Sequence, residues 1–161
     1  MTQLDFLTKE FPKLLAGIDP TAAPAWGKMS VQQMIEHMSD SLRIANGRDL
    51  KDCVTPAEKL PDMRRFLASD KPFRENTVNI QMPAEPLPCR WPGVEDALGE
   101  LREELRAFVD VFDQDKQKTI TNPFFGDLNF QEWTQLLTKH ALHHLRQFGV
   151  VPELSIEPFG T

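Results

Sequence analysis

The stretch that follows Pro92 and Gly93 carries an apolar pattern that a long helix explains. Its apolar residues are separated by four, three, four, three and four positions, as in the seam of a helical bundle. They are Val94, Leu98, Leu101, Leu105, Phe108 and Phe112. At 3.6 residues per turn, this spacing places all of these side chains on one face. We therefore predict a helix that runs to about Asp115 and buries this face against other elements.

Three further segments show helical periodicity, over about residues 2–16, 30–46 and 129–149. Each segment has end signals of the kind that stop or start helices, namely capping boxes, glycines and prolines. The signals are Gly17 and Pro20 after the first segment, Ser30 with Gln33 and Asn46 with Gly47 around the second, and Asn129 with Glu132, Gly149 and Pro152 around the last.

The part of the chain between Leu50 and Pro92 contains seven prolines, which exclude a long helix there. The run AEKLPDMRRFLAS within it is compatible with a short helix. Four amphipathic helices with one long link predict an all-α four-helix bundle, with a Pro-rich crossover between its second and third helices. Its 161 residues suit a single domain spanning residues 1–161.

The composition excludes several classes of protein. A net charge of -6, without a run of Lys and Arg among aromatics, argues against a nucleic-acid partner. Charged residues such as Asp5, Lys9 and Glu10 interrupt the N-terminal region, and no stretch approaches the roughly 20 apolar residues that span a bilayer. Cys53 and Cys89 form neither a disulfide framework nor a CxxC motif. We expect a cytoplasmic protein with no membrane partner.

Three of the four histidines, His140, His143 and His144, fall within five residues of the last predicted helix. His140 and His144 lie one turn apart and inside its apolar stripe, whereas His143 lies at the polar edge. Burying an imidazole without a partner costs free energy, so the pair requires either hydrogen bonds to neighbouring side chains or a metal ion. The spacing leaves both interpretations open. His37, at the edge of the apolar face of the second helix, is the one remaining histidine able to complete a metal site.

The segments WGKMSVQQMIEHMSDSL, NPFFGDLNFQEW and KHALHHLRQFG resemble the DinB-like (YfiT-like) superfamily of metal-dependent enzymes, in particular a branch of unknown function. The resemblance covers about residues 26–149. It implies a four-helix bundle in which one histidine of the second helix and the first and last histidines of an HxxHH motif hold a divalent metal. Those positions are His37, His140 and His144. One departure is Asn122, where a histidine often precedes the Pro-Phe-Phe-Gly turn in this branch.

Three imidazoles on one side of an ion leave coordination positions open, as in a catalytic site. The ion can then act as a Lewis acid and activate a bound water or thiol. The resemblance implies either a thiol-dependent S-transferase or a hydrolase acting on a small molecule, and the sequence does not choose between them. Imidazole ligands suit several transition metals, of which we expect zinc or nickel. No HExxH motif or Glu-x-x-His pair points to a zincin or a di-iron protein.

Two carboxylates flank the seam of the third helix, Glu100 and Glu104, and are candidates for a general acid or base. Glutamates on such a face are usually solvated, so neither is assigned that role. Gln147, one turn after His143, is placed to orient a metal ligand.

The competing interpretation is a bundle without catalytic activity, serving as a ligand-binding or interaction module. In that case the histidines either bind a metal for stability or bind none. The first helix and the loop around Pro123, Phe124 and Phe125 carry enough apolar surface to support a homodimer. Exposed phenylalanines in this loop would favour this interpretation, and buried ones would not.

Overall fold

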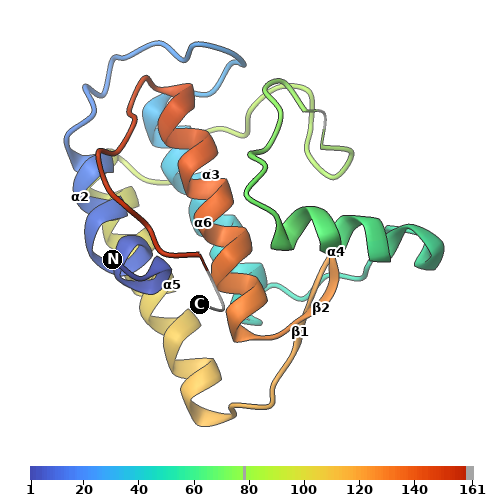
Figure 1. The fold of residues 1–161 in the computed structure, drawn as a ribbon. Helices are drawn as coiled ribbons and strands as arrows, with labels where there is room; N and C mark the ends of the chain where they lie inside the picture. Colours follow the sequence, from blue (N-terminus) through green and yellow to red (C-terminus); the bar gives the residue numbers. More distant parts are fainter. Residues whose placement is uncertain (78, 159–161) are drawn as a thin grey trace.

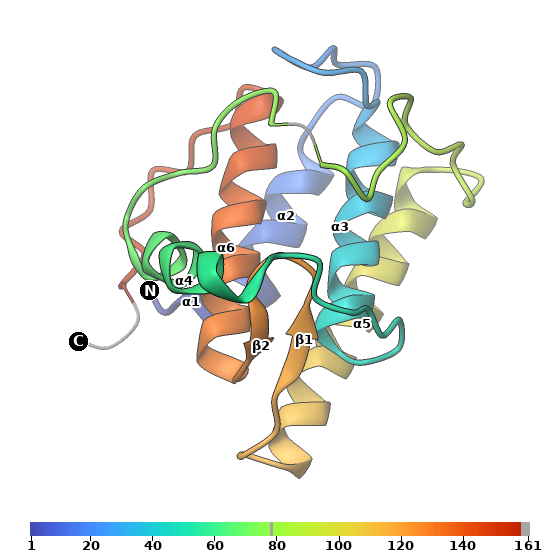
Figure 2. The ribbon, with the colours of Figure 1, turned by 90° about the vertical axis from the view of Figure 1, so that its right-hand side faces the viewer.

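The computed structural model describes residues 1–77 and 79–158 of the chain. Long helical segments pack against one another in it (Figures 1 and 2). They are an N-terminal segment made of α1 (Gln3–Asp5), a π-helical turn η1 (Phe6–Glu10) and α2 (Phe11–Ala16), followed by α3 (Val31–Ala45), α5 (Val94–Gln114) and α6 (Phe130–Gln147). The predicted all-α four-helix bundle is confirmed, with its helices close to the predicted ranges.

The N-terminal segment departs from a regular α-helix. Its middle is a π-helical turn, in which the backbone N–H of Phe11 donates to the carbonyl of Phe6. Pro12 follows directly, in the first turn of α2. Because proline has no N–H, it cannot continue the hydrogen-bond pattern of a helix, but it fits a first turn, where that N–H has no partner. The segment therefore restarts at Pro12 while keeping its apolar face on the bundle.

The long crossover between α3 and α5 is confirmed and contains a helix of its own. A 3₁₀ turn, η2 (Ala57–Lys59), leads into α4 (Leu60–Ala68), which runs across the bundle and packs on α6 (Figure 1). Lys139 of α6 donates to the carbonyls of Ser69 and Lys71, at 2.8 Å for the latter. This ammonium group ties the C-terminal end of α4, where backbone carbonyls lack partners, to the bundle.

A short hairpin between α5 and α6 was not predicted. β1 (Ile120–Asn122) pairs antiparallel with β2 (Gly126–Leu128), so that Asn122 faces Gly126. The Asn122 side-chain oxygen accepts from the backbone N–H groups of Phe124 and Phe125, at 2.9 and 3.0 Å. Gly126 has a φ of 77°, which favours glycine. At the position where the related branch often has a histidine, this chain therefore has a residue that shapes the turn.

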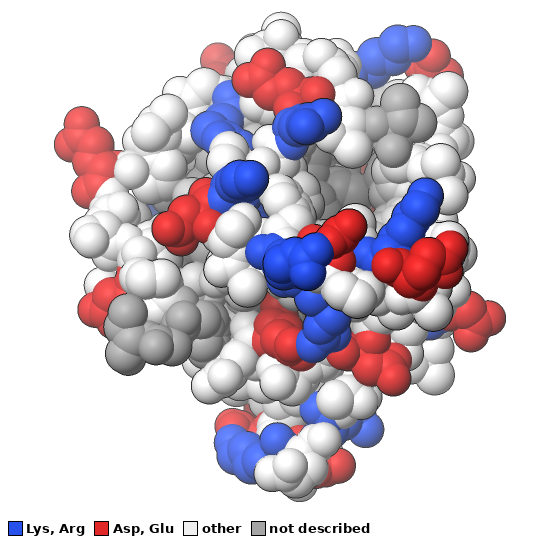
Figure 3. Space-filling model, turned by 45° about the vertical axis from the view of Figure 1, so that its right-hand side comes forward, with Lys and Arg blue, Asp and Glu red and all other residues white. Residues whose placement is uncertain are grey.

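The two phenylalanines of this turn do not form an exposed apolar surface. Phe125 is 4% exposed and Phe124 packs against the core. The apolar surface on which the homodimer argument depended is thus already covered within the chain. On the face drawn in Figure 3, cationic and anionic side chains lie next to one another. Among the described residues, no helix has the length and apolar character needed to cross a membrane.

Trp133, buried near the start of α6, connects the hairpin to the core. Its side chain is 1% exposed, and its indole N–H donates to the carbonyl of Ile120 at 2.9 Å. The core around it draws on each of the long segments. Its largest members are Phe6, Phe11, Met34, Ile35, Leu98, Phe108, Phe112 and Trp133.

Replacing Trp133 by phenylalanine should lower the free energy of unfolding by about 1–3 kcal/mol. The change leaves the Ile120 carbonyl without its buried donor and removes part of the packed ring system. Urea titration followed by circular dichroism would measure the loss. Trp91→Phe is the matched control, because Trp91 is 40% exposed and its indole hydrogen bond, to Glu100, lies at the surface. Equal stability of the two variants would show that burial of the Trp133 indole and its hydrogen bond adds nothing measurable.

Candidate metal centre

Three histidines from two neighbouring helices converge on one point. His37 comes from α3, and His140 and His144 come from adjacent turns of α6. The Nε2 atom of His140 lies 3.0 Å from that of His37 and 2.9 Å from that of His144. The three side chains each offer one ligand nitrogen, and these nitrogens all lie within 4.8 Å of one another. We call them the three-histidine cluster.

The helices that supply the three-histidine cluster are fixed by local signals in the sequence. α3 begins at a capping box made by Ser30 and Gln33, and α6 begins at one made by Asn129 and Glu132. Each box satisfies backbone N–H groups that would otherwise lack partners, which sets where the helix begins. Because α3 packs directly on α6, the boundary position of His37 turns inward.

The tautomer of His144 is set by Gln147, which is buried at 3% exposure. The side-chain oxygen of Gln147 lies 2.7 Å from His144 Nδ1, and its amide nitrogen donates to the carbonyl of Trp26 at 2.9 Å. With the amide so oriented, only Nδ1–H can make the contact, so His144 keeps an Nε2 lone pair that faces the cluster. Gly27 supports this arrangement, because a Cβ atom there would lie 3.0 Å from the Gln147 nitrogen.

The contacts within the three-histidine cluster cannot all be ordinary hydrogen bonds. Both short contacts pass through His140 Nε2, and an imidazole nitrogen carries either one proton or one in-plane lone pair. That single proton or lone pair cannot form linear hydrogen bonds with both neighbouring nitrogens. A cation held by all three lone pairs removes the conflict. Two nitrogens bound at about 2.1 Å and at right angles lie about 3.0 Å apart, so the spacing fits a divalent ion.

Burial keeps all three imidazoles neutral, which is the form that binds metals. Burial, with a smaller contribution from the neighbouring His143, lowers the pKa of His37 to about 4. Burial likewise holds the pKa values of His140 and His144 well below their ordinary value, and the other histidines of the cluster add to the effect. At neutral pH the cluster therefore presents lone pairs and no charge of its own.

The chain matches the DinB superfamily over residues 3–148, which is most of its length. This chain belongs to the DinB superfamily. Neither the comparison with curated proteins nor the one with solved structures gives a match. The resemblance noted in the sequence is thereby confirmed at the level of the family.

The fourth histidine of this DinB domain, His143, stands outside the three-histidine cluster. Its ring packs against the rings of Trp26 and Phe73, with centroids 5.4 and 6.0 Å away, and also touches His144. Burial lowers its pKa, and the nearby Arg146 adds to the effect. His143 thus packs between the cluster and the segments that cover it.

The two glutamates considered as a general acid or base lie elsewhere in the structure. Glu104 is 3% exposed, so the expectation of a solvated side chain is wrong. Its carboxylate contacts Arg43 and Arg48, each at 3.0 Å, and Asn46 at 2.6 Å, which fastens α3 to α5. Glu100 accepts hydrogen bonds from Arg90 and from the indole of Trp91. Neither carboxylate belongs to the three-histidine cluster.

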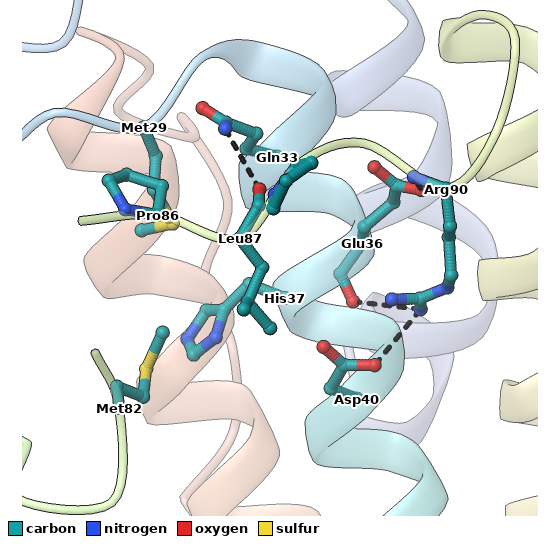
Figure 4. A pocket seen from close by; sticks show the side chains of 10 residues that line it. Met29, Gln33, Glu36, His37, Asp40, Met82, Pro86, Leu87 and Arg90 are labelled. Atoms are coloured by element: carbon teal, nitrogen blue, oxygen red, sulfur yellow. Dashed lines mark hydrogen bonds and ion pairs between the residues drawn. The ribbon is translucent and has the colours of Figure 1, made fainter.

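A cavity of about 30 Å³ opens beside His37, between α3 and the last part of the crossover (Figure 4). A buried water requires roughly 10–15 Å³ of such space, so the cavity has room for about two waters. The cavity was not predictable from the sequence, because residues 82–90 have no periodicity that would place them. It is lined by Met29, Gln33, Glu36, His37, Asp40, Met82, Pro86, Leu87, Pro88 and Arg90.

Proposed function

We propose that this DinB domain is a metal-dependent enzyme that binds one divalent ion through His37, His140 and His144 and acts on a small molecule. The observation that carries the proposal is the convergence of three Nε2 atoms, whose two short contacts cannot both be linear hydrogen bonds. Three neutral imidazoles suit zinc or nickel. When bound, the ion would supply Lewis-acid activation of a nucleophile at its open positions.

The residues around the three-histidine cluster have separate tasks in this proposal. Gln147 holds His144 in the tautomer that binds. Phe73 packs edge-on against the rings of His140 and His143, which covers the cluster from the crossover side. The cavity, which His37 lines, is the approach that we propose for a nucleophile.

The size of the cavity bears on the choice between hydrolysis and thiol transfer. Room for about two waters suits a hydrolase, whose nucleophile is water. A thiol bulkier than the smallest ones would require Met82, Pro86 and Leu87 to move aside, because they line the cavity. We therefore propose hydrolysis as the first activity to screen and transfer to small thiols as the second.

Elemental analysis of protein purified without an affinity tag tests the proposal. We expect about one zinc or nickel ion per chain, removed by a chelator and restored by added metal. Hydrolase and transferase substrates would then be screened with the metal identified. Protein that stays free of metal after incubation with either ion would overturn the metalloenzyme. Stoichiometric metal without activity against both substrate classes would favour the non-catalytic, metal-stabilised bundle.

Gln147 should matter for metal affinity although it is not a ligand in this proposal. Gln147→Leu removes the acceptor of His144 Nδ1–H, and we expect it to weaken zinc binding about 10- to 100-fold. Gln147→Glu keeps an acceptor and should retain most of the affinity. Competition with a chromophoric chelator would measure both. Equal affinities of the leucine variant and the wild type would show that the contact does not orient His144.

A further inference from the structure

The polar end of the cavity beside His37 is formed by Asp40 and Arg90. Asp40 lies three residues after His37 on α3, so the two side chains project from the same side of the helix. One Asp40 oxygen lies 3.0 Å from Arg90 Nη2. In Figure 4 the other oxygen is turned away from Arg90, toward the side on which His37 and Leu87 lie. Asp40 therefore presents a free carboxylate oxygen to the cavity.

Arg90 is held in place by several partners. Its guanidinium donates to Glu100 at 2.9 Å and to the carbonyl of Glu36 at 3.3 Å, besides its contact with Asp40. These contacts use its Nε and Nη2 donors. Arg90 thus orients Asp40, and its charge is shared between Asp40 and Glu100.

Glu36, on the same wall, is 4% exposed. Its Oε1 accepts from the backbone N–H groups of Arg90 and Trp91, at 2.8 and 3.0 Å. Its Oε2 is buried, and no N–H group among the described residues donates to it. Cys89 lies beside this carboxylate, and burial followed by Glu36 raises the pKa of its thiol, so Cys89 is not an activated nucleophile.

The net charge of this wall is negative. The charges around it are three carboxylates, of Glu36, Asp40 and Glu100, against the single guanidinium of Arg90. The nearby Arg43 is paired with buried Glu104. A bound molecule that donates hydrogen bonds, above all a cation, is stabilised by this surface, whereas an anion is repelled. Partial burial raises the pKa of Asp40, whose side chain remains 43% exposed and so lies at the mouth of the cavity.

We propose that Asp40 determines specificity, so that the site accepts small substrates carrying an ammonium or hydroxyl group and rejects those carrying a carboxylate. If thiol transfer is the activity, the thiol is an aminothiol and not a carboxylate-bearing one. This inference rests on the proposed function, because the reacting end of the substrate lies at the metal. The charged or donating end lies at Asp40.

The test uses cobalt-loaded protein and three small thiols that differ in charge, namely cysteamine, 2-mercaptoethanol and mercaptoacetate. A thiolate bound to cobalt gives a charge-transfer band, so affinity is read without an enzymatic assay. Because the thiols differ in acidity, each affinity is compared between the wild type and Asp40→Asn. We expect the substitution to weaken the binding of cysteamine about tenfold and to strengthen the binding of mercaptoacetate several-fold. The affinity for 2-mercaptoethanol should stay within about twofold.

Asp110→Asn is the matched control, because Asp110 is an exposed carboxylate of α5 that does not line the cavity. It should leave all three affinities unchanged. If Asp40→Asn does not fold, the salt dependence of the thiol affinities of the wild type provides the test. Rising salt should weaken the binding of cysteamine and strengthen the binding of mercaptoacetate. If the cobalt band forms but Asp40→Asn changes the affinity for all three thiols to the same extent, the role of Asp40 is overturned and the proposed function is not. Failure to bind cobalt, or the absence of a band with every thiol, overturns the proposed function together with it.

Discussion

Replacing His140 by alanine is expected to weaken zinc binding by about 100- to 1,000-fold, the loss of one ligand's share of a site worth roughly 10 kcal/mol or more. His140 is the strongest choice because its Nε2 lies within 3.0 Å of both other ligand nitrogens. Removing it leaves His37 and His144 as a pair. A chelator competition assay on both proteins gives the ratio of affinities directly.

The matched control for this prediction is His143→Ala. His143 shares the helix, the residue type and the neighbourhood, but it does not belong to the three-histidine cluster. Its replacement should change zinc affinity less than tenfold. If the two alanine variants lose affinity to the same extent, the site does not consist of His37, His140 and His144, and a different set of ligands has to be sought.

The bundle was predictable because its information is local and periodic. The apolar seam from Val94 to Phe112 faces the core as expected, with its members buried or packed against buried residues. The capping boxes at Ser30 and Asn129 were also found where the sequence predicts them. Such signals depend on residues within four positions of one another, so a single sequence contains them in full.

Features set by hydrogen bonds over short irregular stretches were missed. The hairpin from Ile120 to Leu128 has strands of three residues, too short for an alternating pattern to be recognised. The π-helical turn before Pro12 leaves the apolar spacing of the first segment intact, so periodicity does not distinguish it from an α-helix.

The candidate site likewise contains residues that the sequence predicts and residues whose surroundings it does not predict. His140 and His144 are related by helical spacing, and His37 followed from the family resemblance. The carboxylates were different, because their surroundings depend on contacts between segments that are distant in the sequence. Glu104 meets Arg43 and Arg48 across two helices, and Asp40 meets Arg90 across fifty residues of chain. Pairings of this kind leave no periodic trace in the sequence, and they decide which carboxylate faces the cavity.

Acidification should destabilise the metal-free protein steeply between about pH 6.5 and 4. The pKa of His37 is about 4 in the folded chain and near 6.5 when unfolded, so the unfolded chain binds more protons in this range. The contribution of neutral His37 to stability is therefore complete above about pH 6.5 and lost as the pH falls. The loss amounts to about 3 kcal/mol for His37. His140 and His144, with pKa values lowered in the same direction, add to it.

Urea unfolding in the presence of a chelator, at intervals from about pH 4 to 7.5, measures this slope. His37→Gln is the informative comparison, because it removes one titrating group and leaves the others, so its stability should fall less steeply with acid. Parallel profiles for the two proteins would show that His37 is not held neutral by burial. Added zinc should steepen the wild-type profile, because the same protons that destabilise the free cluster compete with the ion for its lone pairs. In His37→Gln, which has one imidazole fewer, that additional steepening should be smaller.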